Sequence, residues 1–261
     1  MPDYSPADDL AVALTLAAEA DLVSLDRFRA SDLDVSLKAD RTHVTDADRR
    51  VERVLREHLA ALRPDDAVLG EELGAEGSGA RRWIVDPIDG TANFMRGVPV
   101  WGTLLALVVD GDPVVGVVSA PALGRRWWAA TGSGAWTREW GGDDRRLHVS
   151  GVADLDEASV SYQSFQGWDG AGRFDQLVAL NRSVWRTRAY GDLWGHMLVA
   201  EGAVDAAAEF DVKPWDIAAL WPIVREAGGR ITSADGADSI EEGSVLASNG
   251  VLHDALLDIV R

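Results

Sequence analysis

The segment that most constrains the fold is 101–121, with the sequence WGTLLALVVDGDPVVGVVSAP. Two apolar runs rich in Val and Leu flank the turn-forming residues Asp110-Gly111-Asp112-Pro113. This pattern predicts two antiparallel strands joined by a hairpin. The next apolar segment, 127–136, contains Gly132 and Gly134 and predicts that the same sheet continues through a glycine-rich turn. A sizeable sheet is therefore expected in the first half of the chain.

Two helices are expected before this sheet. Ser5-Pro6 is followed by two acids and by apolar residues at helical spacing, which is typical of a helix start. Thr45 and Asp48 have the spacing of a capping box before a second amphipathic stretch. The polar segment 31–44 between them is predicted to be a loop.

The second half of the chain has a different pattern. Short strand-like runs (ASVSYQS, VDAAAEF, GGRITS and GSVLASN) alternate with helical stretches near 174–180, 194–201, 217–227 and 252–260. Such alternation favours an α/β fold. We expect a single catalytic unit over 1–261, with an α+β subdomain at about 1–146 and an α/β subdomain at about 147–261.

Composition excludes several classes of protein. With 43 acids against 25 bases the formal charge is −18, so a nucleic-acid backbone would be repelled. Cysteine is absent, which excludes disulfides and thiolate metal sites and suits a reducing compartment. A signal peptide would require a basic residue near the N-terminus, but none precedes Arg27. The apolar run 98–109 is too short to span a membrane. A cytoplasmic protein is expected.

Acidic residues stand where three predicted strands or loops end. They are Glu71 and Glu72 in LGEE, Asp86 and Asp89 in VDPIDGT, and Asp216 in KPWDIAAL. Hard divalent cations such as Mg2+ prefer oxygen ligands and are commonly held by a few carboxylates together with a substrate phosphate. These segments are therefore candidates for one metal site.

The middle segment has the most specific spacing. Asp86 and Asp89 are separated by a proline turn that lets both carboxylates face one point, with the Ile88 carbonyl beside them. Gly90-Thr91 can then begin a helix whose free N–H groups attract a phosphate. A capped turn without catalysis is the alternative. The phosphate-binding loop G-x-x-x-x-G-K-[ST], the nucleophile elbow G-x-S-x-G and the zinc motif H-E-x-x-H are all absent.

The motifs GEE (Gly70–Glu72), DPIDGTANF (Asp86–Phe94) and Trp215-Asp216 resemble three signatures of the inositol monophosphatase superfamily. VTDAD (Val44–Asp48) and GGRIT (Gly228–Thr232) extend the resemblance over nearly the whole chain. It implies a layered α/β/α/β/α sandwich and a phosphomonoesterase that depends on Mg2+, accepts Mn2+ as a possible substitute and is inhibited by Li+.

The resemblance also implies roles for individual residues. Glu71, Asp86 and the Ile88 carbonyl would hold one Mg2+, and Asp86, Asp89 and Asp216 a second, with a weaker third ion near Glu71. Water between Glu71 and Thr91 would attack phosphorus, while Asp48 supports Thr91. The backbone of Gly90 and Thr91 would bind the phosphate.

Substrate choice depends on a different region, 186–210. Arg188, Asp192, Trp194 and Glu209 are the candidate substrate contacts, and Glu209 matches the acid that meets a substrate hydroxyl in the superfamily. Asp192 is an added acid that would favour a cationic alcohol, because a charge-assisted hydrogen bond is stronger than a neutral one. A role for Asp192 as a helix N-cap is the alternative. His196 is interpreted as a structural helix residue.

Within the superfamily, R-A-Y-G-D (188–192) and VSAPALGRRWWAA (118–130) most resemble the histidinol-phosphatase branch of actinobacterial type. This implies hydrolysis of L-histidinol phosphate in histidine biosynthesis by a homodimer. Inositol-1-phosphate or a related sugar or nucleotide phosphate is the alternative substrate. A metal-binding scaffold without catalytic activity is the alternative from a different class of function.

Overall fold

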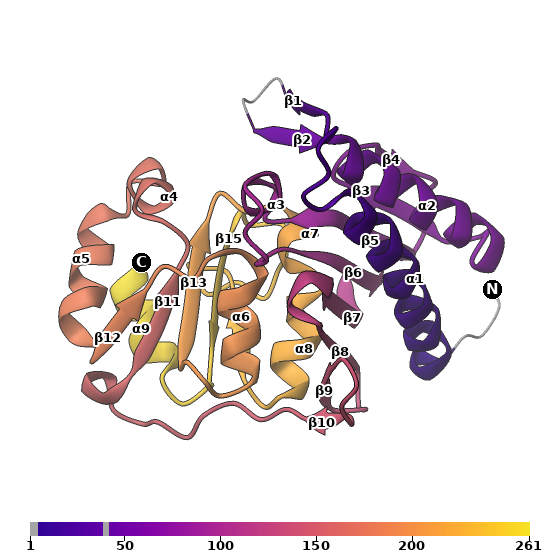
Figure 1. Ribbon diagram of the computed structural model, residues 1–261. Coiled ribbons are helices and arrows are strands. Elements are labelled where there is room, and N and C mark those ends of the chain that lie inside the picture. The colour runs from indigo at the N-terminus through magenta and orange to yellow at the C-terminus, as the bar shows by residue number, and fades with distance from the viewer. Residues whose placement is uncertain (1–4, 39–41) are drawn as a thin grey trace.

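The computed structural model describes residues 5–38 and 42–261. Five layers follow one another across the molecule in Figure 1: helices, a sheet, helices, a second sheet, and helices. The predicted α/β/α/β/α sandwich is confirmed. No helix in the described part of the chain is long and apolar enough to cross a membrane.

The first layer consists of α1 (Pro6–Arg27) and α2 (Asp46–Leu62), and both begin where the sequence predicts. Ser5 and Thr45 are the N-caps, and each forms a capping box with the acid three residues later. Between these helices the sequence predicted a loop. The structure instead forms a small antiparallel pair, β1 (Val35–Leu37) with β2 (His43–Thr45), because Val35 and Leu37 are spaced for strand pairing despite their polar neighbours.

The larger sheet has eight strands in the order β10-β9-β8-β7-β6-β5-β3-β4. The predicted hairpin is confirmed as β6 (Gly102–Val109) and β7 (Asp112–Ala120). The other strands are β3 (Ala67–Gly70), β4 (Gly74–Glu76), β5 (Arg81–Asp89), β8 (Arg125–Ala130), β9 (Ala135–Glu139) and β10 (Arg145–Arg146). Strand β5 lies inside this sheet, between β6 and β3, so its carboxyl end has a neighbouring strand on each side.

The second sheet has five strands in the order β12-β11-β13-β15-β14. They are β11 (Ser159–Tyr162), β12 (Arg186–Arg188), β13 (Ala206–Phe210), β14 (Arg230–Thr232) and β15 (Ser244–Ser248). The remaining helices are α3 (Thr91–Met95), α4 (Phe165–Gly170), α5 (Phe174–Ser183), α6 (Asp192–Ala200), α7 (Pro214–Ile217), α8 (Leu220–Glu226) and α9 (His253–Val260).

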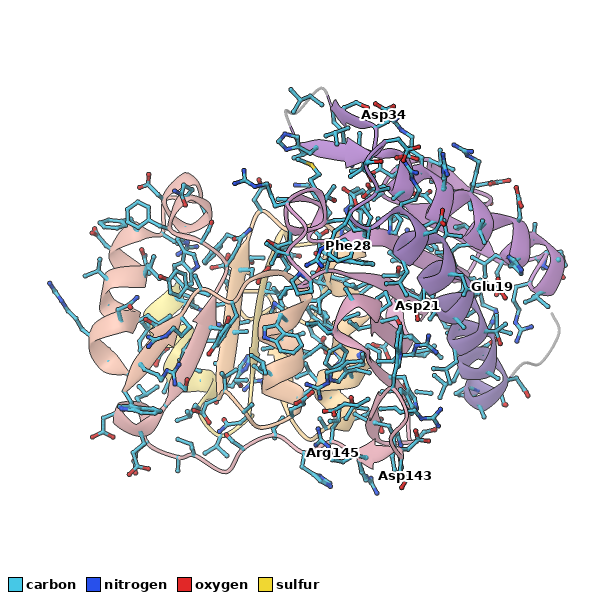
Figure 2. The ribbon with its side chains drawn as sticks, viewed as in Figure 1. Glu19, Asp21, Phe28, Asp34, Asp143 and Arg145 are labelled. Carbon is cyan, nitrogen blue, oxygen red and sulfur yellow. The ribbon has the colours of Figure 1, made fainter. Side chains whose placement is uncertain are left out.

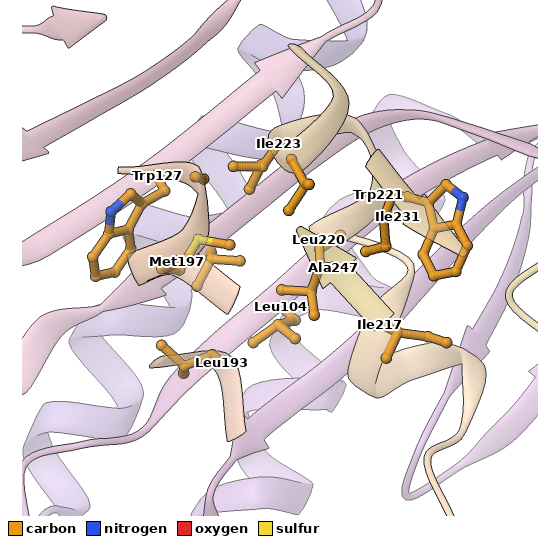
Figure 3. Close-up of a cluster of buried hydrophobic side chains, with 14 of the residues drawn as sticks. Leu104, Trp127, Leu193, Met197, Ile217, Leu220, Trp221, Ile223, Ile231 and Ala247 are labelled. Atoms are coloured by element: carbon orange, nitrogen blue, oxygen red, sulfur yellow. The ribbon is translucent and has the colours of Figure 1, made fainter. Parts of the chain in front are cut away.

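Three apolar cores join the layers. One lies between α1, α2 and the outer face of the eight-stranded sheet (the large sheet). Another lies between the five-stranded sheet (the small sheet) and the helices α5 and α9. The third lies between the two sheets and contains α6 and α8; Figure 3 shows Leu193 and Met197 of α6 near Leu104 of β6. Each fully buried leucine stabilises the fold by about 1.5–3 kcal/mol. Because both sheets share this third core, α6 is packed firmly on both sides.

Candidate active site

Three carboxylates converge at the carboxyl end of β5. Asp86 and Asp89 come from β5 itself and Asp216 from the short helix α7, and each offers an oxygen within 4.8 Å of the other two. The three-residue spacing thus brings both β5 acids to one point, as predicted from the sequence. Asp216 approaches from a segment more than a hundred residues away because α7 packs against β5.

The ionised carboxylates of this cluster repel one another unless a cation lies between them. Burial and then repulsion from the neighbouring acids raise the pKa values of Asp86 and Asp89 well above their usual range. Burial likewise raises the pKa of Asp216 to about 7. Asp86 is 1% exposed, and its Oδ1 has no hydrogen-bond partner among the described residues. A buried carboxylate oxygen without a partner, beside two further acids, fits a divalent cation held by oxygen ligands.

Glu71 follows β3 and lies beside this cluster, where its charge contributes to the raised pKa of Asp86. The structure adds a residue that the sequence reasoning missed. Lys38 Nζ lies 2.7 Å from Glu71 Oε1 and 2.6 Å from Glu72 Oε1. Burial raises the pKa of Glu72 to about 7, although its pairing with Lys38 acts in the opposite direction. Glu71 therefore has a cationic neighbour on the side of the β1–β2 pair.

A second missed residue, Glu52 of α2, anchors the loop after β3. Glu52 is fully buried and accepts hydrogen bonds from the N–H groups of Glu72 and Leu73 at 2.7 and 3.1 Å. Arg56 balances its charge at 2.8 Å. A Cβ added to Gly70 would lie 2.0 Å from Glu52 Oε1, so this close approach requires glycine. Glu52 thus fixes the backbone that presents Glu71.

The turn after β5 joins Thr91 to Asp48, as the resemblance implied. Gly90 is the N-cap of α3 with φ +82°, and a Cβ there would lie 3.1 Å from the Val100 carbonyl. The Thr91 hydroxyl lies 3.2 Å from Asp48 Oδ1 and 3.0 Å from the Ile88 carbonyl, the two acceptors open to it. The Asp48 carboxylate is fully buried and is itself fixed by the Thr45 N–H and hydroxyl.

Aromatic packing holds this turn rigid. The Phe28 ring, labelled in Figure 2, lies 5.5 Å from that of Phe94 and 5.2 Å from that of Trp101. The Ile88 side chain is fully buried in the same cluster. The Ile88 side chain is thus anchored in this cluster, while the Ile88 carbonyl accepts a hydrogen bond from Thr91.

Asp192 begins α6 and reaches the same turn. Its Oδ2 accepts a hydrogen bond from Asn93 Nδ2 at 3.2 Å and lies 3.4 Å from where a Cβ on Gly90 would be. The Leu193 N–H donates to Asp89 Oδ2 at 2.6 Å. The alternative role of Asp192 as an N-cap is wrong, because Gly191 is the N-cap and no side chain caps this helix. Asn93 is a further residue that the sequence reasoning missed, although it stands inside DPIDGTANF.

Burial, followed by repulsion from Glu209, raises the pKa of Asp192 to about 6. Glu209 lies on β13, is 6% exposed, and also adds to the raised pKa values of Asp89 and Asp216. The site therefore contains two acids, Asp192 and Glu209, beside the candidate metal ligands.

The other two predicted substrate contacts lie differently. Arg188 is exposed on the edge strand β12, and its guanidinium donates to the carbonyl of the adjacent Thr187 at 2.7 Å. The Trp194 ring packs edge-on against Trp127 at 5.8 Å and below Arg125. Both positions are explained by protein contacts alone, so their contact with substrate stays a prediction.

Comparison with known proteins agrees with this geometry. The model of the inositol monophosphatase family matches residues 6–261. A histidinol-phosphatase of Streptomyces coelicolor is 53% identical over 98% of this chain and 97% of its own, and one of Mycobacterium tuberculosis is 55% identical over 96% of both. The crystal structure of the extragenic suppressor protein suhB from Bartonella henselae has a TM-score of 0.87 at 30% identity, covering 96% of this chain and 97% of that one. The chain belongs to the inositol monophosphatase family.

Proposed function

We propose that this protein hydrolyses L-histidinol phosphate to L-histidinol and phosphate with the help of Mg2+. Family membership makes it a phosphatase, and two relatives that are more than half identical to it are named histidinol-phosphatase. The single observation behind the choice of substrate is the pair of acids beside the candidate metal ligands, the half-buried Asp192 and the buried Glu209. A neutral alcohol would leave their charges unpaired, whereas the ammonium and imidazole of histidinol would pair with them.

The candidate ligands divide into two sets. Glu71, Asp86 and the Ile88 carbonyl would hold one Mg2+, and Asp86, Asp89 and Asp216 another, with Mn2+ as a substitute and Li+ as an inhibitor. When bound, such ions activate water and offset the charge of the phosphate. Their charge would also stabilise the ionised carboxylates, whose pKa values are raised by burial and mutual repulsion.

Thr91 and Glu71 would position the attacking water. The Thr91 hydroxyl hydrogen is directed to Asp48 or to the Ile88 carbonyl, so the hydroxyl oxygen is left as an acceptor for a hydrogen of the water. Glu71, held through the loop that Glu52 anchors, would accept the other hydrogen. Asp48 acts through Thr91 and is a positioning residue.

The backbone at the start of α3 would bind the phosphate. The first N–H groups of a helix have no partner within it, and Gly90 and Thr91 begin α3 directly after the strand end that carries Asp86 and Asp89. Because Asp192 lies against Gly90, the alcohol of a phosphate bound there would lie near Asp192 and Glu209.

The test is kcat/KM on L-histidinol phosphate and on inositol 1-phosphate, with Mg2+, for the native protein and for Asp192→Ala. We expect the native protein to prefer histidinol phosphate by at least about tenfold, or about 1.4 kcal/mol. Asp192→Ala should lose most of that preference, while the exposed Asp258→Ala, a matched control on α9, should keep it. Better hydrolysis of inositol 1-phosphate by the native protein would favour the alternative substrate. No Mg2+-dependent phosphate release from either ester would favour a silent scaffold.

A homodimer and a cytoplasmic location are also proposed, from the family resemblance and the cysteine-free composition. Light scattering after size-exclusion chromatography should give twice the chain mass of 28.1 kDa.

A further inference from the structure

A cluster of buried polar groups without partners lies between α6 and the small sheet. It contains Ser161 of β11, His196 of α6 and Glu209 of β13, which are 1%, 1% and 6% exposed. Ser161 Oγ, both ring nitrogens of His196 and Glu209 Oε1 have no hydrogen-bond partner among the described residues. Buried polar atoms are nearly always paired, so four such atoms in one interface require an explanation.

The register of the small sheet accounts for this grouping. Ser161 pairs with Ala207 in the sheet, and Ala207 belongs to the core around α6. Glu209, two residues further along β13, points to the same side because side chains alternate along a strand. His196 Nε2 lies 3.6 Å from Glu209 Oε1, just beyond hydrogen-bonding distance.

A second buried histidine, His253, has the contacts expected of a purely structural residue. His253 is also fully buried, and its Nδ1 and Nε2 lie 2.8 and 3.0 Å from the hydroxyls of Ser248 and Thr232. Both of its ring nitrogens are therefore satisfied within the fold. His196 has the same burial without those partners, and the acid 3.6 Å from its Nε2 is Glu209, a candidate substrate contact.

We propose that His196 is a positioning residue for substrate specificity: its ring donates Nε2–H to Glu209 and thereby aims the carboxylate at the ammonium of the substrate. This inference rests on the proposed function. A hydrogen bond from the imidazole fixes the orientation of the carboxylate, as histidine–carboxylate pairs do around other sites. Side-chain movements of a few tenths of an ångström, which need no bound substrate, would bring the two atoms into hydrogen-bonding distance.

The inference predicts an effect that depends on the charge of the alcohol. A freely rotating Glu209 would lose more binding to an ammonium than to a hydroxyl, because the charge-assisted hydrogen bond is the stronger of the two. The attacking water, which Thr91 and Glu71 position, would be unaffected. KM for the amine-bearing ester should therefore rise, with kcat changing little.

The experiment compares His196→Leu with His196→Gln, whose side-chain amide can reach the position of Nε2. For histidinol phosphate, His196→Leu should raise KM about tenfold, whereas kcat/KM for inositol 1-phosphate should change less than about threefold. His196→Gln should recover most of the loss. In a Glu209→Gln background, His196→Leu should add nothing further. Equal losses on both esters, no recovery with Gln, or additive effects in the double variant would overturn the inference.

Nitrogen NMR of the histidine rings tests the contact independently of the substrate and of the Leu variant. The Nε2 signal of His196 should report an Nε2–H tautomer and should shift in Glu209→Gln, while the signals of His253 should stay in place. An unshifted His196 signal would overturn the inference. A native protein without preference for histidinol phosphate would refute the proposed function, and this NMR result would still decide whether His196 holds Glu209.

Discussion

Replacing Asp216 by Asn should raise the thermal stability of the metal-free protein and lower that of the protein with Mg2+ bound. Asp216 has a pKa of about 7 in the fold against 3.8 for the unperturbed group. A carboxyl whose pKa is raised by folding stabilises the native state below its unfolded pKa, and that contribution is lost as the pH rises through the folded pKa. The rise is about three pKa units of 1.36 kcal/mol each, so ionised Asp216 costs at most about 4 kcal/mol at pH 8.

Asparagine removes the charge but keeps an oxygen that can accept the Lys213 N–H, which now donates to Asp216 Oδ2 at 2.6 Å. The substitution therefore tests the effect of the Asp216 charge on stability separately from its hydrogen bond. Thermal unfolding in EDTA at pH 8 should show Asp216→Asn melting roughly 10 °C above the native protein, since about 1 kcal/mol corresponds to roughly 2–4 °C in a chain of this size.

Two conditions test the cause of that difference. At pH 4 in EDTA the two proteins should melt together, because Asp216 is then largely protonated in the native protein. In millimolar Mg2+ at pH 8 the order should reverse, since a ligand that binds only the folded state stabilises it and the variant lacks one anionic ligand. The exposed Asp258→Asn should leave every curve unchanged. An Asp216→Asn variant that is no more stable than the native protein in EDTA at pH 8 would refute the reasoning.

Three further outcomes are expected. Asp89→Asn should retain the bond from the Leu193 N–H and fold normally, yet lose Mg2+-dependent turnover by at least about a hundredfold; steady-state assays giving near-normal rates would remove Asp89 from the ligand set. Glu52→Ala should cost about 3 kcal/mol, because two N–H groups lose their acceptor and Arg56 loses one of its two carboxylate partners. The variant should also bind Mg2+ more weakly in calorimetry, whereas an unchanged affinity would show that the loop needs no anchor. Burial lowers the pKa of His253 to about 4, so in urea unfolding the stability of the native protein relative to that of a His253→Asn variant should fall by on the order of 3 kcal/mol between pH 7 and pH 4, and a difference that does not change with pH would contradict this.

The parts of the structure that local chemistry decides were predictable from the sequence. Ser5 and Thr45 satisfy the first N–H groups of their own helices, so the starts of α1 and α2 depend only on neighbouring residues. The same holds for the β6–β7 hairpin, whose turn residues stand between two apolar runs. Asp86 and Asp89 converge because the turn between them is short and stiff.

The rest depends on contacts between distant segments. Lys38 reaches Glu71 across 33 residues, and Glu52 reaches the Glu72 N–H across 20. No periodicity or cap motif connects such pairs. Asp192 also has the local sequence of an N-cap, but its carboxylate accepts from Asn93, 99 residues away, and its φ of 48° lies outside the extended region typical of an N-cap. Tertiary contact here overrides the local preference of Asp.

The bond from the Leu193 N–H to Asp89 has a consequence for how such a site can change during evolution. The residue that follows Asp192 is attached directly to a candidate metal ligand, and the rest of α6 is packed between two sheets. An insertion or deletion between β12 and α6 would shift this attachment and move Asp89 with it. We therefore expect the substrate range of this fold to diversify here by exchange of side chains at a constant segment length.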